Sequence, residues 1–245
     1  IRFAVEQFQP QETFLVLNGD VLTDLDVMAL VEFHHDVQAE ATIALQPVDD
    51  PSSFGVVTTD TRGRVEAFIE KPEKGSAPSN NINAGTYVLE PSVVEQIPPG
   101  RPVSVERETF PQLAASGTLY ALPSATYWLD TGTPQQFIQA NLDMLNGKRK
   151  QVPHLPDAVI DPKSLITQSV IGNGSEVEAG AIIDKSVVLD HCQIRANSQV
   201  LGSVLSEDVH VGEGARVDGC VIGKGQHIQP GEMLINESRP EVGPA

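Results

Sequence analysis

The chain has 245 residues, 40% of them hydrophobic, and its 33 acidic side chains outnumber 16 basic ones, which gives a net charge of −17. This excess of negative charge, with no arginine-rich stripe, argues against a nucleic-acid-binding protein. The longest apolar runs have only strand length, which argues against a membrane protein, and a cytoplasmic setting is the default expectation. The two cysteines, Cys192 and Cys220, are not spaced as a zinc-binding pair and imply no structural disulfide.

The first expected elements are a helix at residues 1–8 and a strand at residues 13–17. The strand is continuously apolar, which is typical of a central strand covered on both faces of a sheet. Asn18-Gly19-Asp20 follows it, and Gly19 allows the backbone to turn where the strand ends. Asp20 is therefore expected at the carboxyl-terminal edge of the sheet, where ligands bind in open α/β folds.

A second carboxylate stands in similar surroundings further along the chain. The string Trp128-Leu129-Asp130-Thr131-Gly132-Thr133 also ends an apolar strand and places Asp130 near a glycine. Two such acids suit Mg²⁺, which takes one or two protein carboxylates together with substrate phosphates, so the expected chemistry is phosphoryl or nucleotidyl transfer. The alternative is that Asp20 and Asp130 only cap helices expected at residues 25–37 and 134–145, and for either aspartate alone that alternative is favoured.

Four further strings lie between or beside the aspartates: Phe54-Gly55-Val56-Val57, Glu70-Lys71-Pro72, Asn83-Ala84-Gly85 and Val105-Glu106-Arg107-Glu108-Thr109-Phe110-Pro111. Alone, either central glycine predicts a bulge or turn, and the Glu-Lys pair predicts an exposed ion pair. Together with the two aspartate strings, their order resembles the sugar-phosphate nucleotidyltransferase family over residues 1–147. Within that family the resemblance is to the mannose-1-phosphate guanylyltransferases.

The resemblance implies an α/β fold whose first domain is a partial Rossmann-like nucleotidyltransferase domain, a mostly parallel sheet with helices. It implies a bound Mg²⁺ that bridges the nucleotide and the sugar phosphate. A lysine would pair with the sugar phosphate and a glutamate would accept hydrogen bonds from sugar hydroxyls. The implied residues are the metal ligands Asp20 and Asp130, the catalytic lysine Lys71, and the sugar-binding residues Gly55, Glu70, Asn83 and Gly85.

The implied substrates are a nucleoside triphosphate and a hexose 1-phosphate, in particular GTP and mannose 1-phosphate, which give GDP-mannose and pyrophosphate. Catalysis would be mostly alignment and charge neutralisation, because the attacking phosphate oxygen is already ionised. A thymidylyl- or uridylyltransferase acting on glucose 1-phosphate stays open, because guanine is implied only by the resemblance, chiefly that of the string at residues 104–111. Glu106 and Arg107 either shape the sugar pocket or form the polar first turn of a helix at residues 105–115.

One departure from the family matters. The glycine-rich, arginine-bearing loop and the lysine-proline string that cradle the nucleotide do not occur, and the chain opens at Ile1. We expect an amino-terminally truncated fragment that lacks about a hundred residues of nucleotide-binding structure, by the family's plan. Its sheet would then lack a strand, and the chain as given would not turn over.

From Ile160 onward, branched aliphatic residues recur in steps of six, five and six, so that each position returns after seventeen residues. Three columns of inward side chains predict a three-sided coil, with glycines at corners that need positive φ angles. The pattern resembles the left-handed parallel β-helix of hexapeptide repeats. The columns are Ile166, Ile183, Val200, Val217 and Leu234; Ile171, Val188, Leu205 and Ile222; and Val177, Ile194, Val211 and Ile228.

The expected role of the coils is homo-oligomerisation or docking on the first domain. A hexapeptide-repeat acyltransferase is the alternative from another class, with His191, His210 or His227 as its base. The expected domain plan is a nucleotidyltransferase domain at residues 1–147, a linker at 148–157, the β-helix at 158–236 and a flexible tail at 237–245.

Overall fold

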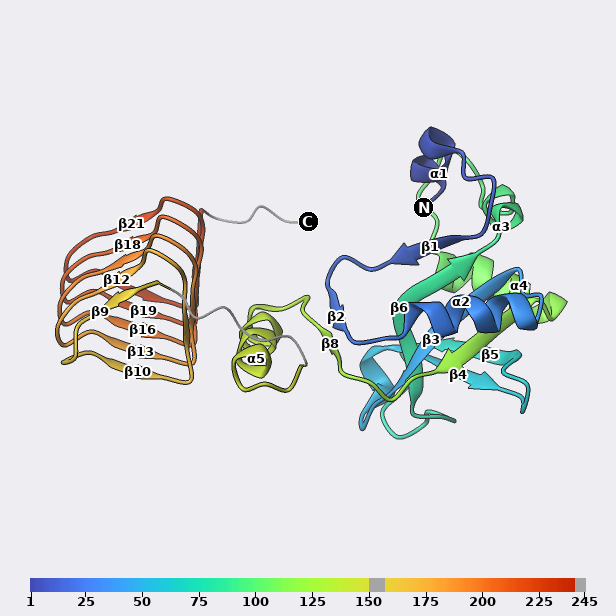
Figure 1. Cartoon of the computed structure of the whole chain (residues 1–245), viewed down its shortest axis with the longest axis horizontal. Helices are drawn as coiled ribbons and strands as arrows, with labels where there is room; N and C mark the ends of the chain where they lie inside the picture. The colour runs from blue at the N-terminus through green and yellow to red at the C-terminus, as the bar shows by residue number, and fades with distance from the viewer. Residues whose placement is uncertain (150–156, 241–245) are drawn as a thin grey trace. The chain divides into compact units, whose positions relative to one another are not determined.

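The structure is a computed structural model that describes residues 1–149 and 157–240. Most of the expected linker and the last five residues of the expected tail lie outside the described residues. The chain divides into two compact units, Ile1–Trp128 and Leu129–Ala245. Each unit is described by itself below, with the element labels of Figure 1.

The first unit is a mixed sheet with helices against it (Figure 1). Its strands are β1 (Phe14–Leu17), β2 (Val21–Thr23), β3 (Ala41–Pro47), β4 (Gly55–Thr59), β5 (Val65–Glu70), β6 (Asn81–Leu89) and β7 (Leu119–Pro123), and β8 (Trp128–Asp130) begins at its end. Its helices are α1 (Arg2–Phe8), α2 (Val27–Asp36), the 3₁₀ turn η1 (Pro51–Ser53), α3 (Pro91–Glu95), the π turn η2 (Val105–Thr109) and α4 (Phe110–Ser116). The single helix expected at residues 105–115 is thus a π turn followed by an α-helix.

The α/β class is confirmed, but the expected mostly parallel pairing is wrong in the part of the sheet that the structure describes. The strand order is β5-β4-β6-β3-β7, and β1 also pairs with β6. Only β3 and β7 pair in parallel, because the long central strand β6 runs against β1, β3 and β4. An apolar strand pattern carries no information on strand direction, which is why the sequence could not reveal this reversal.

Strand β1 is also less covered than its apolar sequence predicts. Phe14 and Val16 are half-buried against the core, whereas Leu15 is 40% and Leu17 is 59% exposed. Among the described residues, β1 pairs only with β6. The expectation of a strand covered on both faces is therefore wrong for these residues, and β1 has an alternating burial pattern.

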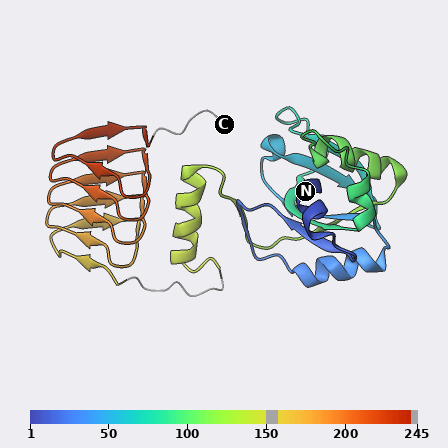
Figure 2. The same cartoon turned by 90° about the horizontal axis from the view of Figure 1, so that it is seen from above.

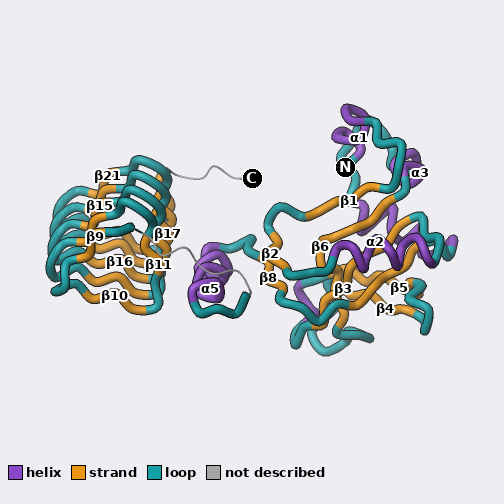
Figure 3. The backbone as a smooth tube through the Cα atoms, viewed as in Figure 1, coloured by secondary structure: helices purple, strands orange, loops and turns teal. Residues whose placement is uncertain are grey.

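Two apolar clusters cover opposite faces of the sheet, as the alternation of side chains along a strand requires. On one face Phe110 of α4 packs against Ile43 and Tyr87. On the other face Leu30 of α2 packs against Ala44 and Val88. Figure 3 shows α2 along the sheet beside β3 and β6.

A buried histidine links α2 to the sheet. His34 is 1% exposed, its Nδ1 lies 2.8 Å from Thr42 Oγ1, and its Nε2 lies 3.1 Å from Glu90 Oε1. Thr13 Oγ1 donates to the same Glu90 oxygen at 2.6 Å. Burial lowers the pKa of His34 below its ordinary value, although Glu90 partly opposes this effect. Charging this imidazole therefore costs more in the folded protein than in the unfolded chain.

We expect the first unit to lose stability as the pH falls below about 6.5, the ordinary pKa of histidine. The unfolded chain then binds a proton that folded His34 does not, so the free energy of unfolding falls by up to about 1.4 kcal/mol per pH unit. Urea unfolding between pH 7.5 and pH 5.5 measures this slope through the fluorescence of Trp128, the chain's only tryptophan, which lies in this unit. His34→Gln should flatten the slope and His35→Gln, at an exposed neighbour, should not; a wild-type midpoint that is constant with pH would contradict the prediction.

The second unit contains α5 (Pro134–Leu145) and a stack of parallel coils, which Figures 1 and 2 show as parallel rows of short strands. One side consists of β10 (Leu165–Thr167), β13 (Ile182–Asp184), β16 (Gln199–Leu201), β19 (Arg216–Asp218) and β22 (Met233–Ile235). A second consists of β11 (Val170–Ile171), β14 (Val187–Val188), β17 (Val204–Leu205), β20 (Val221–Ile222) and β23 (Ser238–Arg239). The third consists of β9 (Val159–Ile160), β12 (Glu176–Val177), β15 (Gln193–Ile194), β18 (His210–Val211) and β21 (His227–Ile228).

The strand registers confirm the three columns predicted from the seventeen-residue repeat. Ile166 pairs with Ile183, Ile171 with Val188, and Val177 with Ile194. In the middle coils these inward side chains are fully buried. A parallel β-helix therefore follows the expected register through its described length.

The glycines at the corners meet the sequence expectation only in part. Gly174, Gly214 and Gly225 do adopt positive φ angles, between 64° and 68°. Gly172 does not; it is required because a Cβ there would lie 2.5 Å from the carbonyl carbon of Leu189 in the next coil. Gly212 is required for the same reason, because a Cβ there would lie 2.5 Å from Pro230 N in the next coil. Two different needs therefore select the paired glycines, a left-handed backbone and close contact between coils.

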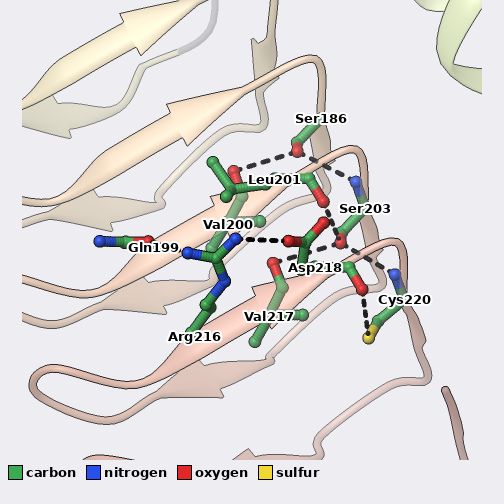
Figure 4. A network of polar contacts seen from close by, with 9 residues as sticks. All are labelled: Ser186, Gln199, Val200, Leu201, Ser203, Arg216, Val217, Asp218 and Cys220. Carbon is green, nitrogen blue, oxygen red and sulfur yellow. Dashed lines mark hydrogen bonds and ion pairs between the residues drawn. The ribbon is translucent and has the colours of Figure 1, made fainter. Parts of the chain in front are cut away.

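Buried hydroxyl groups connect successive coils along one corner (Figure 4). Ser203 N donates to Ser186 Oγ at 3.1 Å, and Cys220 N donates to Ser203 Oγ at 3.0 Å. Each hydroxyl also donates to a backbone carbonyl, as Ser203 does to Leu201 O at 2.7 Å. Cys220 therefore occupies a serine position of the repeat, which explains its burial without a disulfide or a metal.

Candidate functional site

Two of the sequence strings meet directly at the carboxyl-terminal end of β1. Asn18 N donates to Gly85 O at 2.8 Å. Gly85 has a φ of 74°, and a Cβ at that position would lie 2.7 Å from Asn18 Nδ2. Only glycine combines this backbone conformation with this close approach. The turn that carries Asp20 is thus held against β6 by Gly85.

A third string joins the same place through its tryptophan. Trp128 Nε1 donates to Ala84 O at 2.9 Å, and its ring packs edge-to-face on Phe54 at 5.7 Å between centroids. Both partners belong to motifs predicted to form the sugar site. The indole therefore fixes the start of β8, two residues before Asp130, against β6.

Asp20 lies in the turn after β1 and Asp130 is the last residue of β8, and neither caps the helix that follows it. Helix α2 is capped by Asp26, whose side chain accepts from Ala29 N, and α5 is capped by Thr133, whose hydroxyl accepts from Gln136 N. Asp130 Oδ1 instead accepts from Gly132 N at 2.7 Å. The helix-cap alternative is therefore wrong for both aspartates. Asp20 belongs to the first compact unit and Asp130 to the second.

Gly55 and Glu70 face each other across the β4–β5 hairpin. A Cβ on Gly55 would lie 2.8 Å from the ring of Phe68 and 3.0 Å from Glu70 Oε2. Gly55 is buried, and the absence of a side chain there allows the Phe68 ring and the Glu70 carboxylate to pack directly on its backbone. Arg107 approaches the other oxygen of Glu70 at 4.0 Å.

Lys71 follows Glu70 with a φ of 47°, which is uncommon for a residue with a side chain. Its backbone N–H donates to Phe54 O at 3.0 Å, which holds the hairpin end closed beside Gly55. Strained backbone of this kind costs of order 1–3 kcal/mol and persists where the surroundings enforce it, often at functional sites. The observation agrees with a binding role for this corner.

Asn83 is held by a triangle of hydrogen bonds. Its Nδ2 donates to Tyr87 Oη at 2.9 Å and to Glu106 Oε1 at 2.9 Å, and its Oδ1 accepts from Gly85 N at 3.0 Å. Tyr87 Oη lies 3.1 Å from the same Glu106 oxygen. The amide orientation is unambiguous, because a carboxylate only accepts and a backbone N–H only donates. Burial, together with the nearby glutamates, raises the pKa of Tyr87 far above its ordinary value.

A cavity of about 800 Å³ lies next to this triangle. It is lined in part by Asn18, Tyr87, Ser104 and Glu106. Within the part of the chain that the structure describes, no cluster of three or more histidine, cysteine, aspartate or glutamate side chains could hold a metal. No helix among those residues is long and apolar enough to cross a membrane.

The histidines of the coils have structural surroundings. His191 has a φ of 60° and stands at a corner, in the repeat position occupied by Gly174 and Gly225. His210 and His227 are paired neighbours on one side of the coil, with stacked rings 4.3 Å apart. Nothing in these contacts positions a base beside a nucleophile.

Comparison with known proteins defines the class. The family model of nucleotidyl transferases matches residues 1–147, and the model of the GMPPB C-terminal domain matches residues 149–239. The chain therefore belongs to the nucleotidyl transferase family, and the resemblance read from the six strings is confirmed.

Its relatives narrow the similarity further. The chain is 41% identical over 181 residues to a mannose-1-phosphate guanylyltransferase of Mycobacterium tuberculosis. The matched region covers 69% of this chain and 50% of the relative. It is 39% identical to a probable mannose-1-phosphate guanylyltransferase of Arabidopsis thaliana, over 66% of this chain and 50% of the relative. The mannose-1-phosphate guanylyltransferase catalytic subunit beta of Danio rerio is 36% identical, over 65% of this chain and 46% of the relative. The chain spans about half the length of these curated relatives.

Proposed function

We propose that this chain is the sugar-phosphate and metal-binding part of a mannose-1-phosphate guanylyltransferase, which makes GDP-mannose and pyrophosphate from GTP and mannose 1-phosphate. The observation that carries the proposal is the meeting of the strings at one end of β6. Gly85 holds Asn18, Ala84 holds Trp128, and Asn83 holds Glu106. These contacts join four of the six strings, and Phe54 joins the other two to them through the Trp128 ring and Lys71 N. Chance occurrences of short strings would not make such a set of contacts.

In this proposal the sugar phosphate binds at the hairpin corner. Lys71 neutralises its phosphate, and Glu70, which packs against Gly55, accepts hydrogen bonds from hexose hydroxyls. Asn83 and Gly85 complete the wall of the pocket. Asn83 acts mainly by holding its neighbours, because both of its amide protons are already used.

Members of this family typically use a divalent metal, and the chemistry of the donor set fits Mg²⁺. Asp20, in a turn, and Asp130, at the end of β8, supply hard oxygen donors, and neither is engaged as a helix cap. Mg²⁺ takes one or two protein carboxylates and completes its shell with water and phosphate oxygens. When bound, it would neutralise phosphate charge as the sugar phosphate attacks.

The chain's own residues would contribute alignment. The phosphate oxygen of the hexose 1-phosphate is ionised near neutral pH, so no general base is required. Lys71 and Glu70 would orient that oxygen for in-line attack on the α-phosphorus of the nucleotide, and pyrophosphate would leave.

The test is a panel of GTP, UTP and dTTP against mannose 1-phosphate and glucose 1-phosphate, with pyrophosphate release as the measurement. It should be run on the chain alone and on the chain joined to the nucleotide-binding segment of the Mycobacterium tuberculosis relative. We expect the joined protein to prefer GTP with mannose 1-phosphate. Preference of the joined protein for UTP or dTTP with glucose 1-phosphate would favour the open alternative. No turnover of any pair by the joined protein would contradict the proposal, whereas the chain alone is expected to be inactive.

The β-helix is proposed as an assembly scaffold, and homo-oligomerisation and a cytoplasmic setting stay predictions. The acyltransferase alternative has no contact in its favour, since the coil histidines occupy corner and stacked positions.

A further inference from the structure

The side chain of Glu106 is only partly used by the protein. Its Oε1 accepts from Asn83 Nδ2 and lies 3.1 Å from the Tyr87 hydroxyl. Its Oε2 makes no hydrogen bond with any of the described residues, although the residue is half-buried and lines the cavity of about 800 Å³. A carboxylate oxygen in a partly closed site gains from a donor that a ligand brings.

The surroundings of Glu106 specify what kind of donor fits. Glu106 contacts Asn83, and the next residue of η2, Arg107, approaches the proposed sugar-binding carboxylate of Glu70 at 4.0 Å. The cavity that Glu106 lines carries neutral polar groups from Asn18, Tyr87 and Ser104, and its lining also includes arginines and apolar residues. At Glu106 itself, the second carboxylate oxygen suits a hydroxyl donor of a sugar better than a phosphate, because two negative groups repel each other.

The π turn explains how Glu106 reaches this place. Ser104 caps η2 through a hydrogen bond from Arg107 N, at 3.3 Å, and Thr109 and Phe110 are buried behind it. The wider π turn precedes α4, and single π turns of this kind are frequent at functional sites. The sequence alternative, a polar first turn of an ordinary helix, does not account for the contacts that Glu106 makes with Asn83 and Tyr87.

We propose that Glu106 is a second sugar-recognition carboxylate, whose Oε1 is fixed by Asn83 and Tyr87 and whose Oε2 accepts a hydrogen bond from one hydroxyl of the bound hexose 1-phosphate. This inference rests on the proposed function. It adds a specificity-determining residue on η2 to the Glu70 of the β4–β5 hairpin, and it gives the Asn83 triangle a purpose, which is to hold Glu106 in one orientation.

Glu106→Gln tests the inference with little change of shape. The glutamine oxygen can still accept from Asn83, so the triangle stays, while an NH₂ group replaces the accepting Oε2 on the cavity side. A lost hydrogen bond to a charged group costs about 1.5–3 kcal/mol, or roughly 10- to 100-fold in affinity. Glu108→Gln is the matched control, because Glu108 belongs to the same turn and pairs with Arg101 instead.

Binding of mannose 1-phosphate to the whole chain can be followed by the fluorescence of Trp128, whose ring packs on Phe54 beside Gly55. We expect Glu106→Gln to weaken binding at least about tenfold, Glu108→Gln to leave it within about twofold, and both to keep the wild-type melting temperature. The 2-, 3-, 4- and 6-deoxymannose 1-phosphates each lack one hydroxyl group. One of them should bind the wild type about tenfold more weakly than mannose 1-phosphate does. For that sugar, Glu106→Gln should cause no further loss of affinity.

The outcomes separate this inference from the proposed function. If the wild type binds mannose 1-phosphate and Glu106→Gln binds it equally well, the inference is overturned and the proposed function stands. An equal loss for every deoxy sugar with a lowered melting temperature would show a structural role only, and would also overturn it. If no hexose 1-phosphate binds to the wild type, the proposed function itself fails.

Discussion

Asp130→Asn or Asp20→Asn is expected to lower guanylyltransferase turnover by at least about a thousandfold, because each removes one charge from the proposed metal site. Loss of a metal that supplies several kcal/mol of charge stabilisation accounts for an effect of this size. The Asp130→Asn variant should keep the fold, since an asparagine oxygen can still accept the hydrogen bond from Gly132 N. Pyrophosphate release in the joined protein described above measures the effect.

Asp26→Asn is the matched control for the aspartate variants. Asp26 caps α2, and asparagine caps a helix about as well as aspartate, so this variant should keep both stability and turnover. Titration of Mn²⁺ into the wild type and each variant gives a second readout. Retained turnover and unchanged Mn²⁺ affinity in either site variant would contradict the proposed metal site.

The second large effect concerns the interior of the β-helix. Leu205→Ala should lower the free energy of unfolding of the second unit by about 2–5 kcal/mol, because Leu205 is fully buried and the coil cannot close the cavity that is left. Val204→Ala, at the half-buried neighbouring position, is the control and should cost much less. Hydrogen exchange of the coil amides measures both, and equal protection in the two variants would show that the interior column does not carry the stability.

The β-helix could be predicted from the sequence in most of its detail. Each inward position recurs after seventeen residues, so columns such as Ile183, Val200 and Val217 followed from spacing alone. The period is visible because every coil has the same length and the same inward positions. The close contact at Gly172 was not predictable, since it depends on where the backbone of the next coil lies.

The first unit was less predictable, for reasons that particular residues make plain. The approach of Gly85 to Asn18 joins segments far apart in the sequence, and no local pattern encodes it. The direction of β6 was missed because burial patterns are the same for parallel and antiparallel strands. The helix cap of α2 could have been assigned to Asp26, which immediately precedes the helix, and this assignment would have strengthened the case for Asp20.

The network around Glu106 shows a further limit of sequence reasoning. Asn83 and Glu106 stand in different strings, and each was interpretable by itself as a wall residue or a helix turn. The structure joins them through one carboxylate oxygen. The only signal in the sequence was that Asn83 and Tyr87 stand four residues apart in what is strand β6, so that their side chains share one face of it.

Left-handed residues recur at fixed places around the coil, and this has an evolutionary consequence. They form three rows: Gly174, His191, Asp208 and Gly225; Gly180, Asn197, Gly214 and Gly231; and Gln168, Lys185, Gly202, Gly219 and Asn236. Inserting one residue would move every later bend out of its row and turn aliphatic side chains toward water. Duplicating a whole seventeen-residue block would disturb none of them. Insertions and deletions in this half of the protein should therefore be tolerated when they comprise whole seventeen-residue coils. An insertion of seventeen residues can thus destabilise the fold less than an insertion of one.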